Sequence, residues 1–231
     1  MKVIEESALR DRRLVFEDRL HAGHLLAKKL RPHVAKGNYQ ILAVPAGGVP
    51  VGYVVAEELR IPLDVVIVRK IQIPWNPEAG FGAVAWDGRV ILNEPLVAEL
   101  DLGEDLIEEC ITRTREVVGV RVRKLRGDRP FPNLEGKCVV LVDDGLASGF
   151  TMLVTAESVK AYRPRKIAVA VPTGSERAVG LVAPSVDELV CLNIRGGLMF
   201  AVADAYERWY DLSDEEVLTF LTKSSDENVN Q

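Results

Sequence analysis

The sequence predicts an α/β fold built on a parallel β-sheet with helices on both of its faces. Short apolar runs of the kind that form buried strands alternate with helix-like segments along most of the 231 residues, and this alternation is typical of parallel sheets. Hydrophobic residues make up 48% of the chain, so a sizeable core can form. The length fits one decorated domain or two small ones.

The first half of the chain supplies the start of this alternation. An amphipathic helix is expected over residues 14–31, whose apolar positions include Leu14, Leu20, Leu25, Leu26 and Leu30. The elements expected next are a strand at 39–44, a turn at 45–50, a helix at 51–60 and a strand at 63–70. Residues 71–80 contain two prolines and show no clear period, which favours a loop. Apolar runs on both sides of Asp87-Gly88 predict a hairpin over 81–94.

The second half continues the alternation without an internal repeat. Helices are expected at 104–126, 151–162 and 175–183, and strands at 137–142, 166–172 and 187–194. Parallel sheets of this Rossmann-like kind bind ligands beyond the carboxyl ends of their strands. Three predicted strand ends carry unusual residues, namely "VPAGG" at 44–48, "VRK" at 68–70 and "VDDG" at 142–145.

Charge and cysteine content exclude several classes of protein. The net charge of −5 favours neither a nucleic-acid nor a membrane-surface partner. Cys110, Cys138 and Cys191 are odd in number and lack the C-x-x-C spacing, so we expect neither a disulfide framework nor a zinc site. The charged first residues do not resemble a signal peptide, and no apolar run approaches membrane-spanning length. These features favour a reduced, cytoplasmic setting.

The stretch "VVLVDDGLASGFT" at 139–151 carries the most specific chemistry. Its small loop leads into a predicted helix, whose exposed N–H groups and dipole suit a phosphate. The hydroxyls of Ser148 and Thr151 can add donors. Asp143 and Asp144 would repel an anion directly, so a ribose or a Mg²⁺ ion, held directly or through water, is expected between them. The alternative is an ordinary turn in which a hydroxyl caps the helix, but this would need only one aspartate.

This stretch resembles the phosphoribosyl-diphosphate (PRPP) signature of type I phosphoribosyltransferases, which consists of apolar residues, two acidic residues, small residues and Thr/Ser-Gly-x-Thr. The resemblance implies that Asp143 and Asp144 bind the ribose and hold Mg²⁺. It also implies that five residues take the 5′-phosphate: Ala147, Ser148, Gly149, Phe150 and Thr151. The Phe150 side chain must then point away from the phosphate, because glycine is common at its position.

The other two strand ends resemble the diphosphate-binding parts of that family. Ala46, Gly47 and Gly48 would present N–H groups to the diphosphate, although an arginine often stands where this chain has Ala46. Arg69 and Lys70 would face the same crevice and bind the diphosphate, with Lys70 joining Asp143 and Asp144 as catalytic residues. The alternative for this pair of cations is a solvated surface position.

Residues 71–80 and the hairpin resemble the flexible catalytic loop of the family, in which Trp75 and Glu78 would act. Such a lid excludes water from the reacting carbon. A rigid loop packed on its own domain is the alternative.

The aromatic rings of residues 191–217 are expected to pack the C-terminal segment onto the core. If they do not, the acceptor would be a nitrogen base stacked on Phe200 or Tyr206. In 6-oxopurine enzymes of the family an aspartate stands where this chain has Ala147, which argues against hypoxanthine or guanine as the acceptor.

The resemblance extends over residues 14–220, to a prokaryotic group of predicted phosphoribosyltransferases. We therefore expect one domain over 1–231, with a core at about 35–192 and a small hood from about 1–34 and 193–220. The implied activity is Mg²⁺-dependent transfer of 5-phosphoribose from PRPP to a small nitrogen acceptor, in a cytoplasmic homodimer. A regulatory protein that senses PRPP or a nucleotide without catalysis is the main alternative. A hydrolase or phosphatase is a third, but no nucleophile for it is evident.

Overall fold

The structure, a computed structural model, describes residues 2–34, 37–197 and 199–229, and the side chains at 77, 78 and 225–229 are outside this description. Six parallel strands form the main sheet in the order β1-β9-β8-β7-β2-β3. Their bounds are β1 Lys2–Ile4, β2 Tyr39–Ala43, β3 Leu63–Val65, β7 Cys138–Val142, β8 Lys166–Ser175 and β9 Glu188–Arg195.

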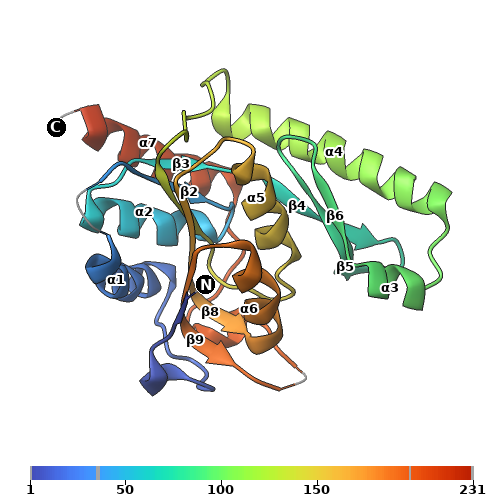
Figure 1. The fold of residues 1–231 in the computed structure, drawn as a ribbon, viewed down its shortest axis with the longest axis horizontal. Helices are drawn as coiled ribbons and strands as arrows, with labels where there is room; N and C mark the ends of the chain where they lie inside the picture. Colours follow the sequence, from blue (N-terminus) through green and yellow to red (C-terminus); the bar gives the residue numbers. More distant parts are fainter. Residues whose placement is uncertain (1, 35–36, 198, 230–231) are drawn as a thin grey trace.

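Helices cover both faces of this sheet, as Figure 1 shows. On one face, α1 (Arg19–Leu30) and α2 (Gly48–Leu59) pack through residues such as Leu26 and Val55. On the other face, α5 (Phe150–Lys160) and α6 (Glu176–Val182) pack through residues such as Met152. The predicted α/β class with a mostly parallel sheet is therefore confirmed. Single-turn 3-10 helices lie at Ser7–Leu9, Arg31–His33, Ala183–Ser185 and Val202–Ala205.

A second, antiparallel sheet consists of β4 (Val68–Ile73), β5 (Asn76–Ala85) and β6 (Val90–Leu92). It stands beside the main sheet between α5 and the long helix α4 (Glu104–Arg126), with α3 (Glu94–Glu99) at one end of it (Figure 1). The Asp87-Gly88 hairpin is confirmed, with Gly88 at a φ of 85°. The last helix, α7 (Asp214–Val229), packs against α2 and β3.

Two expectations about the strands were wrong. The run 63–70 is not one strand, because β3 ends at Val65 in the main sheet and β4 begins at Val68 in the second. Residues 71–80 are mostly strand rather than loop. Pro74 lies in the turn between β4 and β5. Pro77 is compatible with a strand because β6 pairs only with residues 82–84, so the start of β5 is a sheet edge, where proline is tolerated.

Helix boundaries differ from the expectation at two places. The first helix begins at Arg19 rather than at 14, because the Asp18 side chain accepts a hydrogen bond from the His21 backbone N–H and caps it. Residues 14–16 are instead bonded to the backbone of 204–205. Helix α2 begins at Gly48, inside the predicted turn 45–50. None of the helices in the described ranges combines the length and apolar character that a membrane crossing requires.

Candidate functional site

The ends of β2 and β7 lie side by side, because these strands are parallel neighbours and Ala43 pairs with Val142. The segments that follow, 45–48 and 143–149, therefore meet. A Cβ atom on Gly47 would lie 1.7 Å from Asp144 Oδ2, and one on Gly48 would lie 2.7 Å from the Val142 carbonyl oxygen. Both glycines are needed for this close approach. The structure thus brings together two of the three predicted strand ends.

The loop after the acidic pair is fixed at its middle and open at its tip. The Leu146 N–H donates to the Thr173 carbonyl at 2.9 Å and the Ser175 hydroxyl donates to the Ala147 carbonyl at 2.8 Å, which ties the loop to β8. Ala147 and Ser148 remain exposed. Helix α5 begins just behind them, so its N-terminal N–H groups lie at the loop.

Gly149 and Phe150 set the direction in which the chain enters α5. Gly149 has a φ of 87°, which a residue with a side chain rarely adopts. Phe150 is partly buried and packs against the core cluster beneath α5. Its ring is therefore directed at the core. The predicted phosphate site requires this, because a ring that pointed outward would block the loop.

The acidic pair is electrostatically strained. Burial raises the pKa of Asp143 well above the usual aspartate value, and the charge of Asp144 raises it further. Burial also raises the pKa of Asp144, although the nearby Arg19 guanidinium opposes this. Asp143 Oδ1 accepts a hydrogen bond from the Asp144 N–H at 2.8 Å. Two crowded carboxylates of this kind favour a cation or several hydroxyl donors beside them.

Arg19 is a site residue that sequence reasoning missed. Its Nε donates to Asp144 Oδ2 at 2.9 Å, and the arginine is only 7% exposed. The sequence does hold one signal for it, because Arg19 follows the capping residue Asp18 and is the first residue of a helix. A cation is unfavourable at that end of the helix dipole, so an arginine there requires a nearby anion.

Arg69 and Lys70 do not face the same crevice, contrary to expectation. Arg69 pairs with Val84 and lines a groove of about 540 Å³ with α4 residues and Asp214. Lys70 pairs with Ala83, which belongs to the core cluster beneath α5. Successive side chains of a strand point to opposite faces, so only Lys70 lies on the face toward α5.

The proposed lid residues sit at the tip of the β4–β5 hairpin. Trp75 is 62% exposed in the turn between the two strands. The side chain of Glu78 lies outside the described residues. Whether this hairpin closes over a ligand stays a prediction.

Tyr206 does not present a free ring to a base. It is 2% exposed, packs between Phe16 and Trp209, and donates its hydroxyl to the Asp144 backbone carbonyl at 2.7 Å. This is the core packing that the sequence favoured for the C-terminal rings, rather than stacking on an acceptor. Phe200 is half-buried, with the Arg195 guanidinium 4.9 Å from the centre of its ring.

The donor set suits Mg²⁺ only with help from a ligand. Among the described residues there is no group of three His, Cys, Asp or Glu side chains placed to hold a metal ion. Asp143 and Asp144 fit the usual Mg²⁺ arrangement, in which one or two carboxylates act with water and substrate phosphates.

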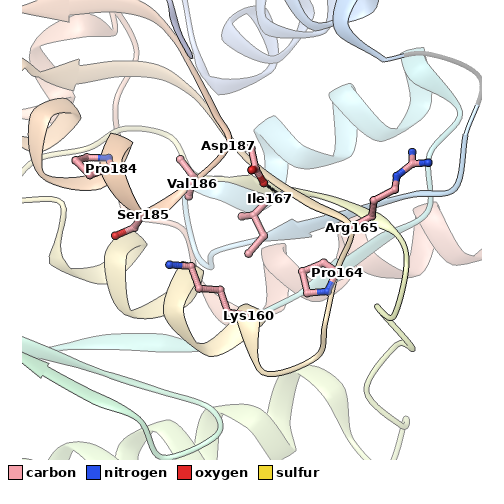
Figure 2. A pocket seen from close by; sticks show the side chains of 8 residues that line it. All are labelled: Lys160, Pro164, Arg165, Ile167, Pro184, Ser185, Val186 and Asp187. Carbon is pink, nitrogen blue, oxygen red and sulfur yellow. Dashed lines mark hydrogen bonds between the residues drawn. The ribbon is translucent and has the colours of Figure 1, made fainter. Parts of the chain in front are cut away.

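A separate hollow of about 360 Å³ lies at the opposite, amino-terminal edge of the sheet, where Figure 2 shows its eight lining residues. Its three charged side chains already have partners within the protein. Lys160 pairs with Glu157 at 2.6 Å, Arg165 donates to Cys138 Sγ at 3.1 Å, and Asp187 accepts from the Ile167 N–H at 2.8 Å. We therefore place the candidate site at the strand ends and not in this hollow.

Comparisons with known proteins agree with this geometry. The profile of the phosphoribosyl transferase domain family matches residues 18–207. A Mycobacterium tuberculosis protein (strain CDC 1551) named as a phosphoribosyl transferase is 36% identical over 210 residues, which are 91% of this chain and 47% of that protein. The chain thus spans about half the length of the curated relatives it matches.

A solved structure from Thermus thermophilus, that of the protein TT1426, is also similar. It is 36% identical, with a TM-score of 0.74 over 91% of this chain and 99% of that one. The residues matched by the family profile include the whole acidic loop, the Gly47–Gly48 turn and Arg19. The chain belongs to the phosphoribosyl transferase family.

Proposed function

We propose that the protein transfers 5-phosphoribose from PRPP to a nitrogen acceptor, most simply a nucleobase, and releases pyrophosphate. The observation that carries this proposal is the close packing of Gly47 and Gly48 against the acidic pair at adjacent strand ends. That packing places two amide-rich loops on either side of two carboxylates. A phosphorylated sugar with a diphosphate substituent has the matching order of charges and hydroxyls.

Each part of the site has a proposed task. The amides and hydroxyls of residues 147–151, at the N-terminus of α5, bind the 5′-phosphate. Asp143 and Asp144 accept hydrogen bonds from the ribose hydroxyls. The amides of 46–48, with Lys70, bind the diphosphate. The acidic pair would hold Mg²⁺ directly or through water, together with the ligand, and the ion would supply positive charge to the leaving group.

The reaction needs little covalent help from the protein. The bond from C1 of the ribose to the diphosphate oxygen breaks, a bond from C1 to the acceptor nitrogen forms, and pyrophosphate leaves. The transition state resembles an oxocarbenium ion, as in glycoside cleavage. Catalysis then comes from fixed anion-binding groups and from exclusion of water by the β4–β5 hairpin.

The acceptor, the assembly and the setting are also proposals. Ala147 disfavours a 6-oxopurine acceptor, and Phe200 remains the candidate ring for stacking within a hood formed by the chain ends. We propose a cytoplasmic homodimer with no nucleic-acid or membrane partner, in line with the net charge of −5.

One observation favours the alternative of a regulatory PRPP or nucleotide sensor. Ala46 stands where relatives often carry an arginine, and Arg69 lies on the far face of its strand. Of the two cations expected at the diphosphate, Arg69 and Lys70, only Lys70 thus lies on the face toward α5. A transferase needs positive charge beside the departing pyrophosphate, whereas a sensor only binds its ligand and does not need this charge.

The deciding experiment is calorimetric titration of PRPP in the presence and absence of Mg²⁺, followed by a pyrophosphate-release assay with a panel of bases. Mg²⁺-dependent binding with release for one base supports the transferase. Binding without release for any base supports the sensor. If PRPP does not bind, the transferase and the PRPP sensor both fail. Gly47→Ala is the negative control, because its Cβ would occupy the position of Asp144 Oδ2.

A further inference from the structure

Arg19 joins three segments that are far apart in the sequence. Besides the bond to Asp144, its Nη1 donates to the Tyr210 carbonyl at 2.9 Å. Its guanidinium carbon lies 3.9 Å from the centre of the Trp209 ring, which is within the range of a cation–π contact. The guanidinium therefore connects α1, the acidic pair and the C-terminal segment 206–210.

The position of Arg19 is electrostatically unfavourable for a cation. Arg19 is buried, and it is the first residue of α1, where the helix dipole disfavours a cation. A methionine or leucine could pack on Trp209 without either cost. The presence of an arginine therefore indicates that a positive charge and a directed N–H are needed at Asp144.

Asp144 is fixed from more than one side. Arg19 holds its Oδ2 atom, and the Tyr206 hydroxyl holds its backbone carbonyl at 2.7 Å. Gly47 lies so close to the same carboxylate that any side chain there would overlap it. Tyr206 in turn packs on Trp209, the ring beneath Arg19. The C-terminal segment and the acidic pair are thus one connected structure.

We propose that Arg19 is a positioning residue of the PRPP site, which holds the Asp144 carboxylate in place against Gly47 and makes ligand affinity depend on the segment 206–210. This inference rests on the proposed function. Arg19 acts through Asp144, so substitutions that keep its charge should keep part of the affinity.

The test compares Arg19→Met and Arg19→Lys with a matched control, Arg126→Met. Arg126 is also buried, is paired with Asp64 at 2.5 Å and lies over the Phe131 ring, but it belongs to the far end of α4. Its loss should lower stability in a similar way without touching the acidic pair.

Affinity for PRPP with Mg²⁺ is measured by calorimetry at a temperature at which every variant is folded. We expect Arg19→Met to weaken binding by about tenfold or more, which is the scale of a lost hydrogen bond to a charged group. Arg19→Lys should lose less, and Arg126→Met should bind like the unaltered protein although its Tm falls. Unchanged affinity in Arg19→Met, or equal losses in all three variants, would overturn the proposal.

A second measurement separates this inference from the proposed function. If the unaltered protein does not bind PRPP, the proposed function fails, and the role of Arg19 is then decided without a ligand. Thermal unfolding is followed for Arg19→Met, Asp144→Asn and the double variant. If Arg19 positions Asp144, the double variant melts no lower than the less stable single variant. Strictly additive shifts in Tm would show that the two residues act independently and would overturn the inference.

Discussion

At the scale of single residues, the two aspartates of the site differ in their surroundings although they are neighbours in the sequence. Asp144 has a cationic partner in Arg19, whereas the described contacts of the Asp143 carboxylate include the Asp144 N–H. Burial and the charge of Asp144 both raise the pKa of Asp143. The folded protein therefore tolerates the charge on Asp143 at the expense of stability.

Asp143→Asn should raise Tm at neutral pH while weakening the binding of PRPP. The amide oxygen can still accept from the Asp144 N–H, and the carboxyl whose ionisation burial disfavours is gone. A gain on the order of a few degrees is expected for a chain of this size. Thermal unfolding and calorimetry measure the two effects, with the exposed Asp211→Asn as control. A lower Tm in Asp143→Asn would contradict this account.

The gain should depend on pH in a defined direction. Because the pKa of Asp143 is raised in the folded state, the carboxyl costs no stability below its pKa in the unfolded chain and costs most above its folded pKa. The difference in Tm between Asp143→Asn and the unaltered protein should therefore shrink as pH falls toward about 4, the usual aspartate value. A difference that is constant with pH would indicate that packing and not charge is responsible.

Gly47→Ala should damage the site more than the fold. Its Cβ would lie 1.7 Å from Asp144 Oδ2, so the carboxylate or the loop must move. We expect a loss of about 1–3 kcal/mol in the free energy of unfolding, as for other overpacked positions, and loss of PRPP binding. Gly103→Ala is the matched control, because no atom lies within 4 Å of its added Cβ. Denaturant unfolding and calorimetry report the two quantities.

At the scale of elements, the two cationic side chains of β4, Arg69 and Lys70, lie on opposite faces of the strand. Lys70 lies on the face toward α5 and Arg69 on the face toward α4. Lys70→Gln should therefore weaken PRPP binding by about tenfold, whereas Arg69→Gln should leave it unchanged. Calorimetric titration of both variants with PRPP measures the two affinities. Equal losses would mean that the hairpin rearranges when the ligand binds.

The same region shows where sequence reasoning reached its limit. Apart from Asp64, the run 63–70 is apolar up to its last two residues and lacks alternation, so nothing in it marks the step from β3 to β4 and from one sheet to another. The hairpin that follows was predictable because Asp87-Gly88 is a turn with its own local chemistry. The helix over 104–126 was predictable for a similar reason, since its period is sustained over 23 residues.

At the scale of the whole molecule, the class of fold followed from alternation, and the place of the candidate site was predicted from the strand ends. Contacts between distant segments did not follow from either. Arg19 and Asp144 are 125 positions apart, and Tyr206 reaches the Asp144 carbonyl across 62. Periodicity describes which face of an element is buried, but it does not say which distant side chain meets it. The chain ends were therefore expected near the acceptor only in general terms, and the hydrogen bond from Tyr206 to Asp144 was not foreseen.

The fully buried Asn193 joins the N-terminal segment to β9. Its side chain donates to the carbonyls of Leu9 and Arg12 and accepts from the Thr173 hydroxyl. Asn193→Ala leaves these groups without their partner, which typically costs about 1–3 kcal/mol for each buried group. Denaturant unfolding should show a marked loss of stability, and exposed Asn38→Ala should show almost none. A neutral Asn193→Ala would mean that the N-terminal segment contributes little to the fold.

The order of strands has a consequence for how such a protein can diversify. From the neighbouring strands β2 and β7 the chain continues outward in opposite directions, to β3 on one side and to β8 and β9 on the other. The chain therefore leaves β2 and β7 toward opposite halves of the sheet, and the place where the segments 45–48 and 143–149 meet belongs to neither half alone. Under the proposed function, PRPP binds where β2 and β7 end, so this part of the site depends on the order of the strands. The acceptor is bound by segments outside the six strands. Descendants of one ancestor could thus exchange acceptors by altering their chain ends, with the central framework unchanged.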